Sequence, residues 1–314
     1  MPETRRIILT SDHHYGKRLP PQVGMVIQWL PVLIADSVSM AFRRQSRFPG
    51  KKPGWFKAAT DIRFIGHEGD DASELIFEAP RLGEAAPELY QQPELWPSRP
   101  EPVDTGFEVL GDVLADISSD CRDSDRYDRG LLKHILKLRS LFQRGIFGDI
   151  EVGSQRHKNG MTPHLNRTVL HTAESIHRTT PLPRRLKLYG TLDMLRASTQ
   201  GFEIRLDSGE KAPGVLVQGD VRQLQGLLGC PVTVYGTAVF RPSGRLLRID
   251  ANEIVPALEQ DRFFTTIPRG TLPPGCSKRI IGGQAARGEL AAIVGKWPGD
   301  ETDEQIQEAL RRLS

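Results

Sequence analysis

The stretch from 184 to 256 constrains the fold most, because it divides into five short segments in which polar and apolar residues alternate. A period of two is typical of a strand that buries one face. The clearest segment is 201–207, where three apolar side chains point one way and Glu203 and Arg205 point the other way. The other predicted strands cover 186–195, 214–217, 232–240 and the region around 247–249.

A short helix is predicted between the third and fourth strands, because the apolar residues of 221–228 have helical spacing and Gly229 follows them. The sequence Leu188-Tyr189-Gly190-Thr191 in the first strand is echoed by Val234-Tyr235-Gly236-Thr237 in the fourth. Glycine inside a strand usually marks a bend or a close backbone approach. This order of elements resembles the OB fold, so the resemblance implies an OB-like β-barrel over 184–256.

Five barrel residues are candidates for nucleic-acid binding, because OB folds commonly bind oligonucleotides on the face of strands two and three. Tyrosines among basic residues supply stacking surfaces and phosphate contacts. The alternative is that these side chains cover the barrel and pack against a neighbouring domain, since acidic residues share the same strands. The alternation predicts that the candidate side chains face away from the barrel core; the candidates are Lys187, Tyr189, Arg205, Tyr235 and Arg248.

Composition sets limits on the function. A chain of 314 residues predicts two or three domains, and a net charge of +3 is too small to imply polyanion binding. The three cysteines are far apart and form no CxxC motif, which indicates neither a zinc site nor a disulfide framework and suits the cytoplasm. No stretch of about 20 apolar residues is evident, so no membrane span is expected. No cofactor is expected either, because the sequence contains no convincing active site.

Residues 1–153 are predicted to form an α+β domain, followed by a connecting helix within 154–183. An apolar stripe predicts a helix over 23–44, which Pro31 kinks or restarts. Thr105 and Glu108 have the spacing of a capping box at a helix start. The other expected elements are a hairpin of 61–65 with 74–78, a short helix at 83–90, a helix at 131–142, a strand at 147–152 and a helix at 163–178.

A basic run with an aromatic pair follows the first predicted helix, from Arg43 to Lys57. Basic residues beside aromatic ones are also found at nucleic-acid interfaces. The favoured interpretation is a solvated loop in which Trp55 fills part of the core.

Ser11-Asp12-His13-His14, after an opening strand at 7–10, resembles the first motif of calcineurin-like metallophosphoesterases. The resemblance implies a two-metal site, which requires further Asp, Asn and His ligands. Gly111-Asp112 is placed inside a predicted helix rather than after a strand, and the remaining motifs are not present. A metal-dependent phosphoesterase is therefore an alternative function, and the competing interpretation is a polar loop.

The C-terminal part is predicted to be a Pro- and Gly-rich linker at 257–288 and a helical tail at 289–314. The sequence 293–306, with its Gly-Lys-Trp element and acidic helix start, resembles the tails of antitoxins that pair with PIN-domain toxins. The resemblance implies docking on such a toxin or on another protein, unless the helix packs on its own chain. Trp297 would anchor the tail in a pocket, with Ile306, Leu310 and Leu313 in a groove.

The sequence thus predicts an α+β protein: a mixed N-terminal domain, a five-stranded OB-like barrel and a C-terminal helical tail. The function expected first is a non-enzymatic, antitoxin-like cytoplasmic protein that binds a protein partner through its tail. Binding of single-stranded nucleic acid by the barrel is the main alternative.

Overall fold

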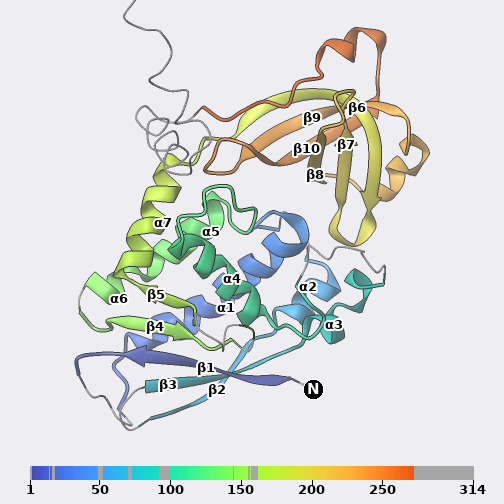
Figure 1. Cartoon of the computed structure of the whole chain (residues 1–314). Helices are drawn as coiled ribbons and strands as arrows, with labels where there is room; N and C mark the ends of the chain where they lie inside the picture. The colour runs from blue at the N-terminus through green and yellow to red at the C-terminus, as the bar shows by residue number, and fades with distance from the viewer. Residues whose placement is uncertain are drawn as a thin grey trace, which may run out of the picture. The chain divides into compact units, whose positions relative to one another are not determined.

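Two β-sheets organise the chain, a five-stranded open sheet and a closed five-stranded barrel (Figure 1). The computed structural model describes residues 2–271, except for 14, 16–17, 49–51, 70–72, 92–99, 144, 155 and 157–161. Helices accompany the open sheet, so the predicted α+β class is confirmed. Residues 1–271 form one unit by their contacts, and 272–314 form a second.

The open sheet has the order β2-β3-β1-β4-β5, with every neighbouring pair antiparallel. Its central strand β1 buries Arg5, Ile7 and Leu9 on alternate positions, as a strand with one covered face requires. The predicted hairpin is confirmed as β2 with β3. The strands are β1 (Glu3–Thr10), β2 (Arg63–Glu68), β3 (Ser73–Ala79), β4 (Asp149–Val152) and β5 (His164–Asn166).

The helices of the described residues contribute to one large apolar core with this sheet. The helix expected at 163–178 begins at Arg167, because 164–166 pair with β4 as a strand, and its apolar face joins the same core. The α-helices are α1 (Val23–Arg43), α2 (Gly54–Ala59), α3 (Leu82–Ala85), α4 (Gly106–Ser118), α5 (Arg129–Ile135), α6 (Arg139–Gln143) and α7 (Arg167–Thr179). Short 3-10 turns are η1 (Pro87–Leu89), η2 (Leu136–Leu138) and η3 (Ala197–Thr199).

Helix α1 is longer and more apolar than expected from the sequence, which predicted no segment suited to a membrane span. It has 21 residues and contains a window of mean hydropathy 1.6, so it meets the length and composition of a membrane span. However, 56% of that window is buried inside the folded protein, as in the core helix of a soluble protein. Pro31 lies within α1 without ending the helix. The cost of its missing backbone N–H donor is offset because apolar residues of α1 are buried both before and after it.

The start of α4 is fixed by the predicted capping box. The Thr105 side chain accepts a hydrogen bond from the Phe107 N–H, and the Glu108 carboxylate accepts one from the Thr105 N–H at 2.7 Å. Both residues are buried, and Glu108 also forms an ion pair with Arg5 at 3.2 Å. The cap therefore links the helix terminus to the central strand of the sheet.

The barrel closes in the order β10-β8-β7-β6-β9. The β8–β10 pair is parallel and the other neighbouring pairs are antiparallel. The helix expected before Gly229 is a 3-10 helix, η4 (Val221–Leu227), of which only Val221 is buried. The strands are β6 (Arg184–Arg196), β7 (Gly201–Arg205), β8 (Lys211–Leu216), β9 (Pro231–Phe240) and β10 (Leu246–Pro256).

Gly190 and Gly236 occupy the close backbone approaches that the repeated motif predicted. A Cβ atom on Gly236 would lie 2.4 Å from the Asp250 carbonyl oxygen of β10. One on Gly190 would lie 2.8 Å from the Arg205 carbonyl oxygen of β7. Both glycines therefore allow the strands to bend around a barrel of small diameter.

The first part of the predicted linker belongs to the barrel instead. Asp261, in the 3-10 helix η5 (Glu259–Phe263), is 1% exposed and accepts a hydrogen bond from the Thr233 hydroxyl at 2.8 Å. The Tyr189 N–H donates to the Phe264 carbonyl at 2.7 Å, and the Gly270 N–H donates to the Gly244 carbonyl at 2.8 Å. The remainder of that segment, 272–288, lies outside the described residues.

The barrel and the helical part share apolar and polar contacts. Val239 of β9 and Leu247 of β10 belong to the core formed by the open sheet and its helices. In addition, Asp123 receives hydrogen bonds from Ser243 and Arg245 in the β9–β10 turn, each 2.7 Å long. These contacts involve one side of the barrel and hold it against the helices.

Candidate functional site

The five barrel residues predicted to bind nucleic acid do not form one surface. Lys187 and Tyr235 lie together, since the Lys187 Nζ atom is 5.3 Å from the centre of the Tyr235 ring. Tyr189 is half-buried, and its N–H donates to the carbonyl of Phe264, the residue after η5. Arg205 and Arg248 lie elsewhere and have other partners.

Arg205 is one member of a balanced group of charges. Its side chain is 53% exposed and pairs with Asp193 at 3.2 Å, while Lys211 pairs with Glu203 at 2.7 Å. Two positive and two negative groups on neighbouring strands leave little net field for a polyanion. The balance of charges on β6, β7 and β8 therefore favours a solvated surface at this position.

Arg248 points out of the barrel core as predicted, but it is covered by the helical part and is 5% exposed. Its guanidinium pairs with Asp128 at 3.1 Å and with Asp250 at 2.7 Å, and it donates to the Arg44 carbonyl. Burial alone would raise the pKa of Asp128, but Arg248 and hydrogen bonds from Ser46 hold that pKa below its usual range. Arg248 is therefore a structural residue, which corrects its prediction as a nucleic-acid contact.

A cluster of aromatic and cationic side chains comprises Lys187, Tyr235 and Phe264, and the exposed Phe263 adjoins Phe264 in the chain. These four residues are called the Tyr235 surface here. The Lys187 ammonium lies 4.5 Å from the centre of the Phe264 ring, besides its contact with Tyr235. Tyr235 is 37% exposed, Phe264 42% and Phe263 87%. Exposed aromatic side chains that lie together on a protein surface often mark a binding site.

The Lys187 side chain of the Tyr235 surface is stabilised in its charged form. Its ammonium pairs with Asp261 at 2.7 Å, and this hydrogen bond raises the pKa of Lys187 and lowers the pKa of Asp261. Arg184, Arg185 and Arg262 lie on the same segments and are exposed. A shallow depression lined by Arg185, Lys187, Tyr235, Thr237 and Asn252 adjoins the surface.

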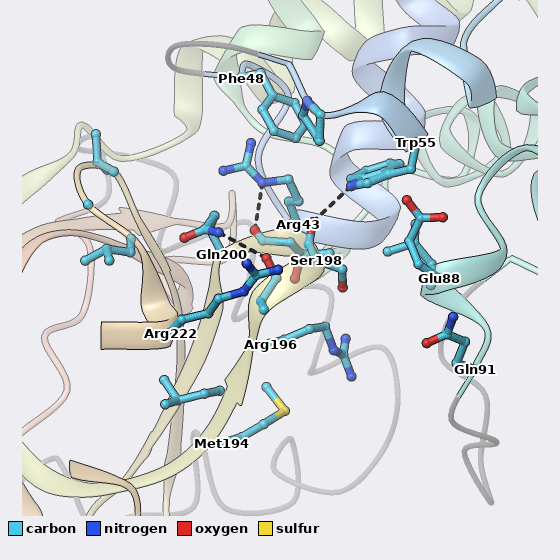
Figure 2. A pocket seen from close by; sticks show the side chains of 18 residues that line it. Arg43, Phe48, Trp55, Glu88, Gln91, Met194, Arg196, Ser198, Gln200 and Arg222 are labelled. Carbon is cyan, nitrogen blue, oxygen red and sulfur yellow. Dashed lines mark hydrogen bonds between the residues drawn. The ribbon is translucent and has the colours of Figure 1, made fainter. Parts of the chain in front are cut away.

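A second candidate site is a cleft of about 850 Å³ between the end of α1 and the β6–β7 connection. Figure 2 shows Arg43, Phe48 and Trp55 on one wall and Arg196, Ser198, Gln200 and Arg222 of the barrel on another. Its charged lining residues are three arginines and one carboxylate, Glu88. The cleft is therefore mainly cationic.

Hydrogen bonds between side chains and the β6–β7 connection hold the walls of this cleft. The Arg43 Nε–H donates to the Thr199 carbonyl at 3.0 Å, and the Trp55 indole N–H donates to the Ser198 carbonyl at 2.9 Å (Figure 2). Trp55 is 4% exposed, which confirms that it fills part of the core. The Gln200 amide donates to the Ala197 carbonyl at 3.0 Å and fixes the turn itself.

Arg43 is unusual among the charged groups of the cleft because it is 5% exposed. The Phe48 ring lies 3.7 Å from its guanidinium carbon, and its Nη1 atom is buried without a hydrogen-bond partner among the described residues. Burial, reinforced by the like charge of Arg248, lowers the pKa of Arg43 to about 10. The group nevertheless stays charged at neutral pH.

The described residues supply no further ligands for the two-metal site of the phosphoesterase alternative. There, no group of three or more His, Cys, Asp or Glu side chains is placed to hold a metal ion. Ser11 accepts a hydrogen bond from the His13 N–H and donates to the Ile146 carbonyl, as in a polar loop after β1. Asp112 lies within α4 and pairs with Arg156 at 2.8 Å.

The tail predictions lie outside the described residues. Trp297, Ile306, Leu310 and Leu313 all belong to 272–314. Docking on a PIN-type toxin or another protein stays a prediction, as does the cytoplasmic location. Comparisons with protein-family models, curated proteins and solved structures find no match to this chain.

The cleft could not be recognised in the sequence. Arg43 stands at the start of a basic run, and no motif marks Arg196 or Arg222. Its walls come from segments more than 140 residues apart, as the bonds from Arg43 and Trp55 show. The one available signal was the position of Arg43, at the end of an apolar helix and close to aromatic residues.

Proposed function

We propose that the barrel is an OB-type domain and that the Tyr235 surface binds single-stranded nucleic acid. The closed strand order supports the first part, since the first barrel strand pairs with the second and the fourth, and the third pairs in parallel with the fifth. OB folds commonly bind oligonucleotides, although on a different face of the barrel. The proposal concerns binding and includes no catalytic step.

The observation that carries the proposal is the exposure of two aromatic rings beside one ammonium group, with a third exposed ring, Phe263, next to Phe264 in the chain. Bases of any sequence can stack on such rings, and lysine and arginine side chains can contact the phosphates that connect them. Asp261 holds Lys187 beside the rings and offsets its charge, so the phosphate contacts would come mainly from the exposed arginines of the same segments. The exposed Arg185 and Arg262 extend the positive charge along the surface.

Binding is tested by fluorescence anisotropy with labelled single-stranded DNA and RNA at two salt concentrations. Because phosphate contacts release counterions, affinity should fall steeply with salt. Phe263→Ala and Tyr235→Ala should each weaken binding by about 5- to 100-fold, the effect of losing one stacked base. Both side chains are accessible, so neither change removes core packing.

Arg205→Ala is the matched control, since Arg205 is exposed on the barrel but belongs to the balanced group with Asp193. Its affinity should equal that of the unmodified protein. The proposal is wrong if neither nucleic acid binds at low salt. It is also wrong if Phe263→Ala and Tyr235→Ala bind as tightly as Arg205→Ala does.

A further inference from the structure

The cleft beside Arg43 is separate from the Tyr235 surface, because the two have no lining residue in common. We propose that this cleft binds a small organic phosphate of about nucleotide size, with Arg43 as the buried anchor and Arg222 and Arg196 as further cationic contacts. This second binding site does not depend on the nucleic-acid proposal.

An anionic ligand follows from the state of Arg43. A buried guanidinium normally has a carboxylate partner, because burying an unpaired charge is costly. Among the described residues, Arg43 has no ion pair, and its Nε–H bond goes to a neutral carbonyl. Arg43 lines the cleft, and its Nη1 atom is buried without a hydrogen-bond partner among the described residues. The nearby Arg248 repels this guanidinium more strongly than Asp250 attracts it. An anion in the cleft would offset the unpaired charge of Arg43.

A phosphate fits this arrangement because guanidinium groups present donors in a planar fork that matches phosphate oxygens. The cation–π contact with Phe48 holds the Arg43 fork in one orientation. Arg222 is exposed and directs its side chain toward the turn at Ser198 and Gln200 in Figure 2. Arg43 donates to the Thr199 carbonyl of the same turn, so guanidinium groups from two different elements lie beside one turn.

The size and apolar lining of the cleft indicate more than an inorganic ion. A volume of about 850 Å³ is within the range of small-molecule sites, which is several hundred cubic ångströms. Leu89, Met194, Leu195 and Leu216 add apolar surface beside the arginines. A ligand with a phosphate at one end and a flat or apolar group at the other would use both kinds of wall.

Isothermal titration calorimetry of the full chain tests this with adenosine 5′-monophosphate, inorganic pyrophosphate and adenosine. We expect the monophosphate and pyrophosphate to bind and adenosine to bind at least about tenfold more weakly, since the charge-assisted hydrogen bonds go to the phosphate. Arg43→Lys keeps the charge but loses the fork and should weaken the monophosphate about tenfold or more. Absence of binding by both phosphates would overturn the proposal.

Arg222→Ala keeps the experiment decisive if Arg43→Lys disturbs folding, because Arg222 is exposed and its loss leaves the core intact. It should also weaken the monophosphate, whereas Arg63→Ala, which removes a 68% exposed arginine on β2, should not. Phe263→Ala should leave monophosphate binding unchanged, which separates this site from the Tyr235 surface. Equal affinities for Arg222→Ala and Arg63→Ala would refute the role of the cleft.

Discussion

Replacing Arg248 with methionine should destabilise the protein strongly, because it leaves a buried carboxylate without its cation. The Arg248 and Asp128 side chains are each 7% exposed, so solvent screens their attraction little. Breaking one partner of such a pair costs about 3–5 kcal/mol. Asp128 still accepts hydrogen bonds from the Gly130 and Leu131 N–H groups, so we expect the lower end of that range. Methionine preserves most of the side-chain volume and avoids a large cavity.

Urea denaturation at neutral pH measures this loss, with Arg245→Ala as the control. Arg245 pairs with Asp123, but the two side chains are 71% and 43% exposed, and an exposed pair contributes about 0–1 kcal/mol. Asp128→Asn alone, and combined with Arg248→Met, completes a double-mutant cycle that isolates the pairwise term. The reasoning is refuted if Arg248→Met costs less than about 1 kcal/mol or no more than Arg245→Ala.

The same variant has a defined pH dependence. In the unmodified protein the pKa of Asp128 lies below its unfolded value, so its stabilisation is present above about pH 4 and is lost as the pH falls through the folded pKa. Without Arg248, burial raises the pKa of Asp128, and the carboxyl group takes up a proton at higher pH. The stability difference between the two proteins should therefore shrink as the solution is acidified. A constant difference would mean that Asp128 is not the group left unpaired.

Three further changes test other parts of the fold. Gly236→Ala should cost about 1–3 kcal/mol in urea denaturation because its Cβ would meet the backbone of β10 at 2.4 Å, whereas Gly226→Ala, with nothing within 4 Å, should be neutral. The pKa of His177 is lowered by burial and then by nearby cations, so the folded state binds fewer protons; thermal stability should fall as pH drops below about 6.5, and less so in His177→Gln. Thr105→Ala removes the capping box with Glu108 and should lower the unfolding free energy by about 0.5–2 kcal/mol, measured by thermal denaturation.

The barrel was predictable from the sequence because each strand has one solvent-facing and one buried face. Polar and apolar residues therefore alternate along the strand. Phe202 and Ile204 alternate with polar neighbours and are buried in the barrel core. The 3-10 form of η4 was not predictable, since apolar residues with helical spacing also fit a tighter helix of only seven residues. The attachment of 257–271 was missed because its proline and glycine content is also typical of linkers.

The candidate sites were less predictable, because alternation tells which side chains leave the barrel core but not what covers them. Arg248 and Tyr235 both point outward, yet one is 5% exposed and the other 37%. The difference comes from the helical part, which packs over one side of the barrel only. Likewise, the environment of Arg43 depends on a turn 156 residues further along the chain, which no local pattern encodes.

The shared core around Val239 and Leu247 has a practical consequence for dissection of this protein. An excised barrel would expose these two side chains to water, and the remaining fragment would lose the surface that seals its own interior. Either fragment would tend to self-associate, and its loss of ligand binding would then reflect insolubility rather than a site shared by both halves. Single substitutions in the intact chain are therefore the safer way to separate the two binding surfaces.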